Sequence, residues 1–401
     1  MKITGKHLLV LVGMCGLIAS GVGLVTNVAG VFFDPVAAEL GVGKGQISLT
    51  LTICNVCFAL GGMLAPRFMR AGSPKPLLVA ATAALAGSTA GLSVAHSIGL
   101  IYALCVVRGF AAGIIGMVFA TSVLNNWFHE GIGLVTSIAF GCSGIAGAVF
   151  SPVLSGVIAS AGWRMGYLSI AAITAVLNLP AILFLPSVTP EGCGMRALGD
   201  TGEAKAQAVE TAQEAATGPI NAALFGLVLA YAVICSGITG LPQHFPGMAE
   251  SFGVGAVGAT MLSFCMIANT AGKVVLGALV DKLGARVSIL AYCALILVSL
   301  FLLLFVHSGT ALVVAAALFG LCYSLATVGI SLTTREVFGP ANYTRVYPTF
   351  SLGGNVANAA FSSIIGFMYD FSGGYALTLY VMAAMTLATG ALIVAAFSKR
   401  A

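Results

Sequence analysis

The segment NTAGKVVLGALVDKLGAR, Asn269–Arg286, decides the fold of this chain. Its first part ends an apolar stretch, Ala256–Val280, that is long enough to cross a lipid bilayer as a helix. The stretch contains one charged residue, Lys273, and the next charge toward the C-terminus, Asp281, lies about 12 Å further along such a helix. A cation at that depth costs between about 3 and 10 kcal/mol. We therefore expect Lys273 to bind an anion.

The composition extends this reading to the whole chain. Hydrophobic residues make up 59% of the 401 positions and charged residues only 7%, whereas a soluble domain has about 25% charged residues. So few charges cannot cover a soluble surface, so we predict an all-α membrane protein surrounded by lipid. The net charge of +5 is not gathered into a basic stripe, and no nucleic acid partner is expected.

Apolar windows of about 20 residues recur along the chain. We predict twelve transmembrane helices, at Leu8–Phe32, Gln46–Ala65, Pro76–Ala95, Gly99–Leu124, Gly133–Ser160, Gly166–Leu185, Pro219–Gln243, Ala256–Val280, Ala285–Val306, Ala311–Leu332, Val346–Met368 and Tyr375–Phe397. The longest polar stretch, Pro186–Gly218, separates the sixth window from the seventh. This spacing predicts a six-helix bundle at 1–186, a cytoplasmic linker at 187–218 and a second six-helix bundle at 219–401.

The basic residues favour one orientation. With the N-terminus in the cytoplasm, thirteen Lys and Arg residues fall on inner segments, and only Lys44 and Arg164 fall on outer ones. This bias follows the positive-inside rule. It predicts a multi-pass protein of the cell (inner) membrane with both termini in the cytoplasm. Within the spans only Arg108 and Lys273 remain.

The two halves also repeat. The segment Phe33–Glu39 aligns with His244–Glu250, and Ala65–Gly72 aligns with Gly277–Gly284 at an offset of 212 residues. Two parallel six-helix repeats joined by a polar linker are typical of rocking transporters. At the same offset Lys273 corresponds to Gly61, so the cation is an addition to the repeat.

The segment Gly277–Arg286 fits the pattern G-x-x-x-D-[R/K]-x-G-x-[R/K]. It resembles the loop signature of the major facilitator superfamily, here between helices 8 and 9. The resemblance implies a conformational latch made by Asp281, Lys282 and Arg286 and framed by Gly277 and Gly284. The copy between helices 2 and 3 is degraded, with Met69 in place of the Asp and only Arg70 and Gly72 kept. A solvated turn with incidental charges is the plain alternative.

A narrower motif set lies in the first half. It resembles the oxalate/formate antiporter and monocarboxylate porter branch of that superfamily, departing from it at His129-Glu130. The matching residues are Asn126-Trp127-Phe128, Gly131, Thr136–Ala139, Gly141, Gly144, Pro152 and Gly162-Trp163-Arg164. Interfacial anchoring by the aromatic residues and close helix packing by the glycines are alternative readings.

This resemblance implies that Lys273 binds the substrate carboxylate, where the branch usually has Arg. Asn269, one turn earlier, stands where proton-linked porters have an acid. Helix 11 reads Ser351–Asn358 and lacks the second cation of an oxalate carrier. These two departures favour a monocarboxylate over a dianion and argue against proton coupling through position 269.

Arg108, near the middle of helix 4, is either a second anion contact or a structural hydrogen-bond hub. Its expected partners are Thr26 or Asn27 on helix 1. Further substrate-binding candidates on cavity-forming helices are Asn27, Tyr231, Tyr323 and Asn355. Each of these is also explained by a hydrogen bond between helices.

We therefore expect a secondary transporter that moves a small organic carboxylate by alternating access, through anion exchange, uniport or proton-linked transport. No Asp or Glu lies well inside a span, which disfavours proton-driven export of cationic drugs. Efflux of hydrophobic drugs or metabolites remains an alternative, as does a membrane ligand sensor that does not transport. No catalytic motif is recognised, and we expect no enzyme activity, cofactor or metal, and a monomer.

Overall fold

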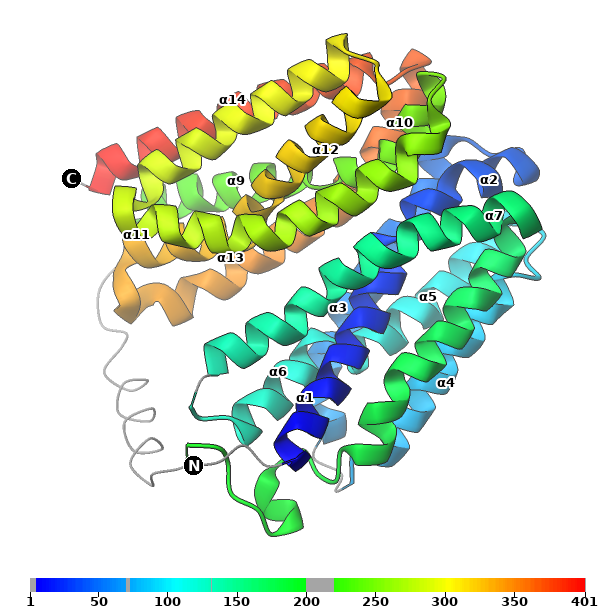
Figure 1. Cartoon of the computed structure of the whole chain (residues 1–401). Helices are drawn as coiled ribbons and strands as arrows, with labels where there is room; N and C mark the ends of the chain where they lie inside the picture. Colours follow the sequence, from blue (N-terminus) through cyan, green and yellow to red (C-terminus); the bar gives the residue numbers. More distant parts are fainter. Residues whose placement is uncertain (1–4, 70–72, 131, 200–219, 401) are drawn as a thin grey trace. The chain divides into compact units, whose positions relative to one another are not determined.

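The computed structural model describes residues 5–69, 73–130, 132–199 and 220–400. Within these ranges the regular structure is helical apart from one isolated bridge between Phe128 and Leu198, which confirms the predicted all-α fold (Figure 1). The elements are α1 Gly5–Ile18, η1 Ala19–Asn27, α2 Gly30–Leu40, α3 Lys44–Met69, α4 Lys75–Leu92, α5 Ile98–Ile114, α6 Met117–Trp127, α7 Ile132–Phe184, η2 Pro190–Cys193, α9 Ala222–Ile238, η3 Leu241–His244, α10 Phe245–Ser251, η4 Gly255–Val257, α11 Gly258–Phe305, α12 Gly309–Tyr323, η5 Ser324–Ala326, α13 Val328–Ser372 and α14 Ala376–Arg400.

The chain divides into two compact units. The first unit comprises Met1–Val42 and Leu49–Gln207, and the second comprises Gly43–Ser48 and Ala208–Ala401. The division at 207 falls within the segment that the sequence assigns to the linker.

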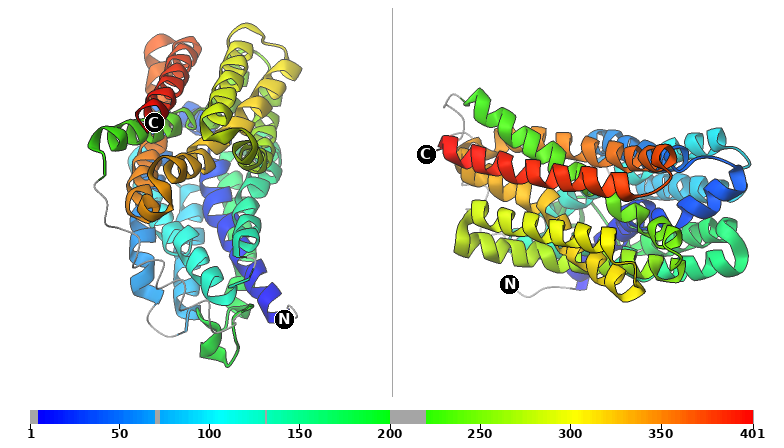
Figure 2. Two further views of the ribbon diagram at one scale, coloured as in Figure 1. Left: turned by 90° about the vertical axis from the view of Figure 1, so that its left-hand side faces the viewer. Right: turned by 90° about the horizontal axis from the view of Figure 1, so that it is seen from above.

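Nine helical segments of the described residues are long and apolar enough to cross a membrane. Three long helices, α7, α11 and α13, each contain one non-helical glycine: Gly162, Gly284 and Gly339. Figure 1 draws each of these helices as two arms that meet at a bend, and Figure 2 shows the same helices from two further directions. Each of the three helices therefore has the form of two spans joined at a single residue.

The three bends have nearly the same backbone geometry. Their φ and ψ angles are 82° and 163° at Gly162, 78° and 161° at Gly284, and 76° and 165° at Gly339. A residue with a Cβ atom essentially never adopts this region of the Ramachandran plot. Glycine is therefore required at these turns by backbone conformation.

The sequence repeat reappears in helix packing. In the first unit α3 and α5 touch at glycines, because a Cβ at Gly109 would overlap the carbonyl oxygen of Cys54. In the second unit the first arm of α11 and α12 touch in the same way, because a Cβ at Gly320 would overlap the carbonyl oxygen of Cys265. Small residues at such crossings let helix backbones approach closely.

Two predicted spans are interrupted. Windows Gly99–Leu124 and Ala311–Leu332 were predicted to span the membrane, and they fall in the segments Ile98–Trp127 and Gly309–Gly339, each of which is long and apolar enough to do so. The first breaks between α5 and α6 at Ile115 and Gly116, and the second breaks at η5 and Thr327. The 212-residue offset maps Ile115 onto Thr327. Helices broken at corresponding positions of two repeats mark the binding region in many transporters.

The segment after α7 folds back onto the first unit. The Trp127 indole nitrogen donates to the Ser187 carbonyl at 3.2 Å, and the Leu198 amide donates to the Trp127 carbonyl at 2.9 Å. Trp127 is fully buried, so this aromatic residue packs inside the protein. The second unit begins with a capped helix, because the Asn221 side chain accepts from the amides of Ala223 and Leu224 at 3.0 and 3.3 Å. Residues 200–219 of the expected linker lie outside the described residues.

Candidate functional site

Lys273 lies on the first arm of α11 in the second unit and is half-buried. Within the described ranges it makes no hydrogen bond, ion pair or ring contact. The backbone beside it is held firmly, because the Tyr292 hydroxyl donates to the Gly272 carbonyl at 3.1 Å. A Cβ at Gly272 would also overlap the carbonyl oxygen of Leu321 on α12. The backbone next to Lys273 is therefore held in place, and its ammonium group has no anionic partner among the described residues.

The repeat explains how α11 accommodates this cation. Gly61, which the sequence offset of 212 pairs with Lys273, packs so closely on α5 that a Cβ there would overlap the Phe110 carbonyl oxygen. In the second unit the same contact is made by Gly272 with the Leu321 carbonyl oxygen. The offset at this crossing is 211 residues, so Gly61 corresponds to Gly272 and the expected match with Lys273 is wrong. The position next to that contact is thus open for a long side chain, and Lys273 occupies it without separating α11 from α12.

Three predicted residues of the second unit lie around the crossing of α11 and α12. Asn269 is one turn before Lys273, is 6% exposed, and has a side-chain oxygen without a hydrogen-bond partner in the described residues. Tyr323 is the last residue of α12, immediately before the break, and lies beside Thr239 and Asn358. Asn358 donates to the Thr239 hydroxyl at 2.7 Å. Lys273, Asn269 and Tyr323 thus belong to the same helix crossing, and their binding of one ligand stays a prediction.

The other two second-unit candidates are placed differently. Tyr231 on α9 is fully buried, and its hydroxyl has no hydrogen-bond partner in the described residues. A Cβ at Gly329, near the start of α13, would lie 3.0 Å from this hydroxyl. Asn355 lies on an exposed face of α13. Tyr231 therefore faces the broken span, whereas no contact in the described residues links Asn355 to Lys273.

Arg108 belongs to the first unit and is 5% exposed. One guanidinium nitrogen, Nη2, donates to the Leu24 carbonyl at 3.1 Å, so the expected partners Thr26 and Asn27 are wrong. The Thr26 hydroxyl bonds to the Asn55 side chain at 3.3 Å, and Asn27 donates to the Ser143 carbonyl at 2.9 Å. The cause is local, because Ala19–Asn27 forms a π-helix, which changes the directions of side chains and carbonyl groups relative to an α-helix.

The predicted latch residues lie at the bend of α11. Asp281, Lys282 and Arg286 are exposed and form no ion pair among the residues that the structure describes. Gly284 makes the bend, and a Cβ at Gly277 would meet nothing within 4 Å. The first-half positions Arg70 and Gly72 lie outside the described residues. The latch therefore stays a prediction.

Sequence reasoning missed Glu336 at this bend. Its Oε2 atom accepts from the Ala285 amide at 2.9 Å, and Ala285 begins the second arm of α11. A carboxylate at a helix N-terminus satisfies a backbone donor and interacts favourably with the helix dipole. The signal available in the sequence was the adjacent charged pair Arg335-Glu336 close to Gly339.

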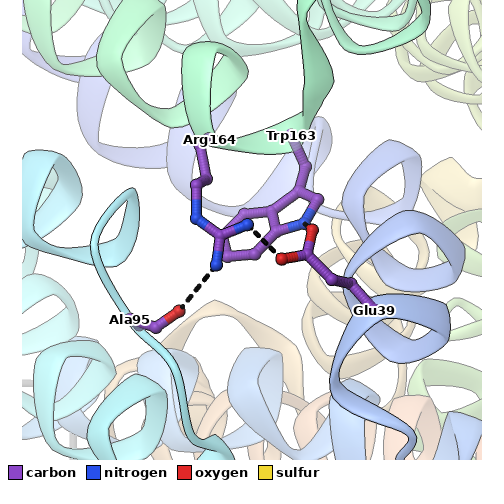
Figure 3. Close-up of polar contacts among 4 residues, drawn as sticks. All are labelled: Glu39, Ala95, Trp163 and Arg164. Atoms are coloured by element: carbon purple, nitrogen blue, oxygen red, sulfur yellow. Dashed lines mark hydrogen bonds and ion pairs between the residues drawn. The ribbon is translucent and has the colours of Figure 1, made fainter.

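The Gly162-Trp163-Arg164 motif forms a polar cluster at the bend of α7 (Figure 3). Glu39 of α2 accepts from the Trp163 indole nitrogen at 2.6 Å and forms an ion pair with Arg164. Arg164 also donates to the Ala95 carbonyl at 3.4 Å. The hydrogen bond from Arg164, followed by that from Trp163, lowers the pKa of Glu39 below its ordinary value of 4.5. This motif thus connects α2, α7 and the segment after α4.

The pKa shift of Glu39 predicts how stability changes with pH. Because the folded-state pKa is lowered, the ion pair stabilises the protein above pH 4.5 and this contribution is lost as the pH falls further. We expect wild type to unfold at a higher temperature than Glu39→Gln at neutral pH, with the difference vanishing in acid. Thermal unfolding against pH measures this, with the exposed Glu191→Gln as the matched control. An equal difference at all pH values would contradict the assignment.

Residues 15–309 and 227–401 match the sequence profile of the Major Facilitator Superfamily, so that the matches together cover most of the chain. The chain belongs to this superfamily. It is therefore a membrane-embedded, multi-pass transporter with the superfamily's two-domain fold. No curated protein matches it in sequence.

Solved structures of the superfamily agree with the fold. The nucleoside transporter NupG matches with a TM-score of 0.72 and 14% identity, over 98% of this chain and 100% of that chain. A bacterial homolog of the human lysosomal transporter Spinster, inward-facing and unoccupied, matches with a TM-score of 0.65 and 13% identity, over 98% of this chain and 95% of that chain. At such identities the likeness concerns the fold alone.

Proposed function

We propose that this chain is a secondary transporter that moves a small organic anion of the monocarboxylate type by alternating access. The observation that carries the proposal is Lys273, a half-buried cation in an apolar helix with no anionic partner in the described residues. Such a charge within a membrane span is rarely retained without a function. A carboxylate bound during transport supplies the missing counter-charge.

The surroundings of Lys273 support a singly charged ligand with a polar or apolar body. Lys presents a compact charge with rotatable donors, unlike the two-pronged guanidinium of Arg. Asn269 and Tyr323 offer neutral polar groups nearby, and α13 has no cation between Ser351 and Asn358. A cationic cargo is disfavoured, because a positive charge about 10 Å from Lys273 is repelled by roughly 1.7 kcal/mol at an effective dielectric constant near 20.

The remaining parts of the proposal follow the sequence. We place the protein in the cell (inner) membrane as a monomer with cytoplasmic termini, and assign the latch to Asp281, Lys282 and Arg286. Anion exchange or uniport is favoured over proton symport, because Asn269 replaces the acid that proton-linked relatives have. Proton-linked transport stays open, since Lys273 can itself release a proton.

Ligand-induced stabilisation of the purified protein tests the substrate class. We expect small monocarboxylates to raise the thermal unfolding temperature in a saturable way, because a ligand that binds only the folded state stabilises it. Amines, uncharged drugs and nucleosides serve as the other arms of the screen. Stabilisation by amines or nucleosides alone would overturn the carboxylate assignment.

Counterflow separates transport from sensing. Proteoliposomes loaded with an unlabelled stabilising carboxylate are expected to accumulate the same labelled acid transiently, because a carrier exchanges substrate across the membrane. Binding without counterflow would favour the sensor alternative.

A further inference from the structure

A small cavity lies inside the first unit beside Arg108. It is bounded by the π-helical segment and α2 on one side and by α3, α5 and α7 on the other. The centre of a water-sized sphere can move through about 10 Å³ of it, which leaves room for a single small species, either a water molecule or a monatomic ion. The polar side chains on its wall are those of Thr50, Cys54, Cys105, Arg108 and Tyr167.

Arg108 is incompletely satisfied at this cavity. Nη2 donates to the Leu24 carbonyl, but the buried Nε has no hydrogen-bond partner in the described residues. A guanidinium has five N–H donors and stays charged in proteins. The side chain is 5% exposed, so bulk water does not solvate the remaining donors.

No carboxylate of the described residues compensates this charge. The side chains that line the cavity include no Asp or Glu, and Arg108 forms no ion pair within the ranges that the structure describes. The Cys54 side chain also interacts with Arg108, and its sulfur lies 3.5 Å from the Cys105 carbonyl oxygen, a contact to which a neutral thiol donates. The guanidinium carbon lies 5.9 Å from the centre of the Tyr167 ring, a contact that offsets only part of a buried charge.

We propose that this cavity binds one halide-sized monovalent anion, held by the Arg108 guanidinium. A neutral water molecule would satisfy a donor but leave the charge uncompensated, whereas a halide does both. Tyr167 also lines the cavity, and a tyrosine hydroxyl is a hydrogen-bond donor that an anion accepts. The ring of Tyr167 is fixed by stacking on Phe32, with ring centres 4.2 Å apart.

The site is distinct from the proposed carboxylate contact. Every residue that lines it belongs to the first unit, whereas Lys273 belongs to the second. Halide binding therefore does not rest on the proposed function. The two ideas can fail separately, because halide binding is measured without any carboxylate.

Equilibrium dialysis with ³⁶Cl⁻ on the purified full-length protein, with gluconate balancing the ionic strength, tests the site. We expect saturable binding of one chloride per chain, and at least about tenfold weaker binding by Arg108→Gln, because hydrogen bonds to charged groups are the strong ones. Lys399→Gln, which removes an exposed lysine near the end of α14, is the matched control and is expected to bind chloride as wild type does. No saturable binding by wild type, or unchanged binding by Arg108→Gln, would overturn the proposal.

A second measurement avoids dependence on a variant that fails to fold. Crystals of the wild-type protein grown in bromide are expected to show an anomalous peak within hydrogen-bond distance of the Arg108 guanidinium. Peaks confined to other places would refute the assignment. Arg108→Lys, which keeps the charge but not the planar fork, is expected to bind chloride more weakly than wild type and more strongly than Arg108→Gln.

Discussion

Lys273→Gln is expected to abolish carboxylate uptake into proteoliposomes while the protein still inserts and folds. Glutamine keeps much of the length and polarity of lysine but removes the charge. Truncating one member of a buried charged pair costs about 2–5 kcal/mol, which corresponds to a loss of roughly 30-fold to several thousand-fold in binding. Uptake of the carboxylate that stabilises wild type measures the effect. Thermal unfolding without ligand checks the fold.

Two further variants separate the role of Lys273 from general effects of charge. Lys399→Gln removes an exposed lysine near the end of α14 and is expected to transport as wild type does. Lys273→Arg restores a cation of the type usual in the branch that the chain resembles, and is expected to retain part of the activity. Full transport by Lys273→Gln would sink the assignment of Lys273 as the anion anchor.

Gly284→Ala is expected to cause the largest loss of stability among single changes in the Gly277–Arg286 segment. Gly284 has φ 78° and ψ 161°, where a Cβ atom is strained. Strain of this kind costs about 1–3 kcal/mol at one residue. A changed backbone at the bend would also disturb the hydrogen bond from the Ala285 amide to Glu336. The unfolding temperature of the purified protein is the readout.

Gly277→Ala is the matched control in the same motif. Gly277 is helical, and a Cβ there would meet nothing within 4 Å. Alanine in the middle of a helix is more favourable than glycine by roughly 0.5–1 kcal/mol. The control should therefore be as stable as wild type or slightly more stable. Equal losses in the two variants would show that the strain at Gly284 is not the cause.

The sequence predicts those features that depend on hydrophobicity and charge. A helix that crosses a lipid bilayer needs a long apolar stretch. The all-α fold and most of the membrane-length segments could therefore be predicted from the composition and from the apolar windows of about 20 residues. Lys273 could be found because a lone charge is conspicuous in such a stretch. The repeat also appears in the helix crossings, where matching glycines such as Gly109 and Gly320 lie 211 residues apart, one residue from the offset that the loop segments give.

Other features depend on backbone geometry that apolar windows do not report. The breaks at Ile115–Gly116 and Thr327 interrupt no hydrophobic pattern, because the interior of a broken span is as apolar as that of a continuous one. The π-helix at Ala19–Asn27 also leaves no mark on the hydrophobic pattern. Because it changes the directions of the carbonyl groups, Arg108 donates its hydrogen bond to the Leu24 carbonyl and not to Thr26 or Asn27. Glu336 was missed because its partner is a backbone amide 51 residues away.

The segment that folds back onto Trp127 has a consequence for the history of the chain. Leu198 closes the first half through its bridge to Phe128, and Asn221 caps the first helix of the second half. A cut anywhere in residues 200–219 would break none of these bonds. The first half therefore ends in a hydrogen-bonded segment and the second half begins with a capped helix, as two separately synthesised polypeptides would require. This is the arrangement expected if an ancestral gene for one half was duplicated and fused, with the joint added between two already complete pieces.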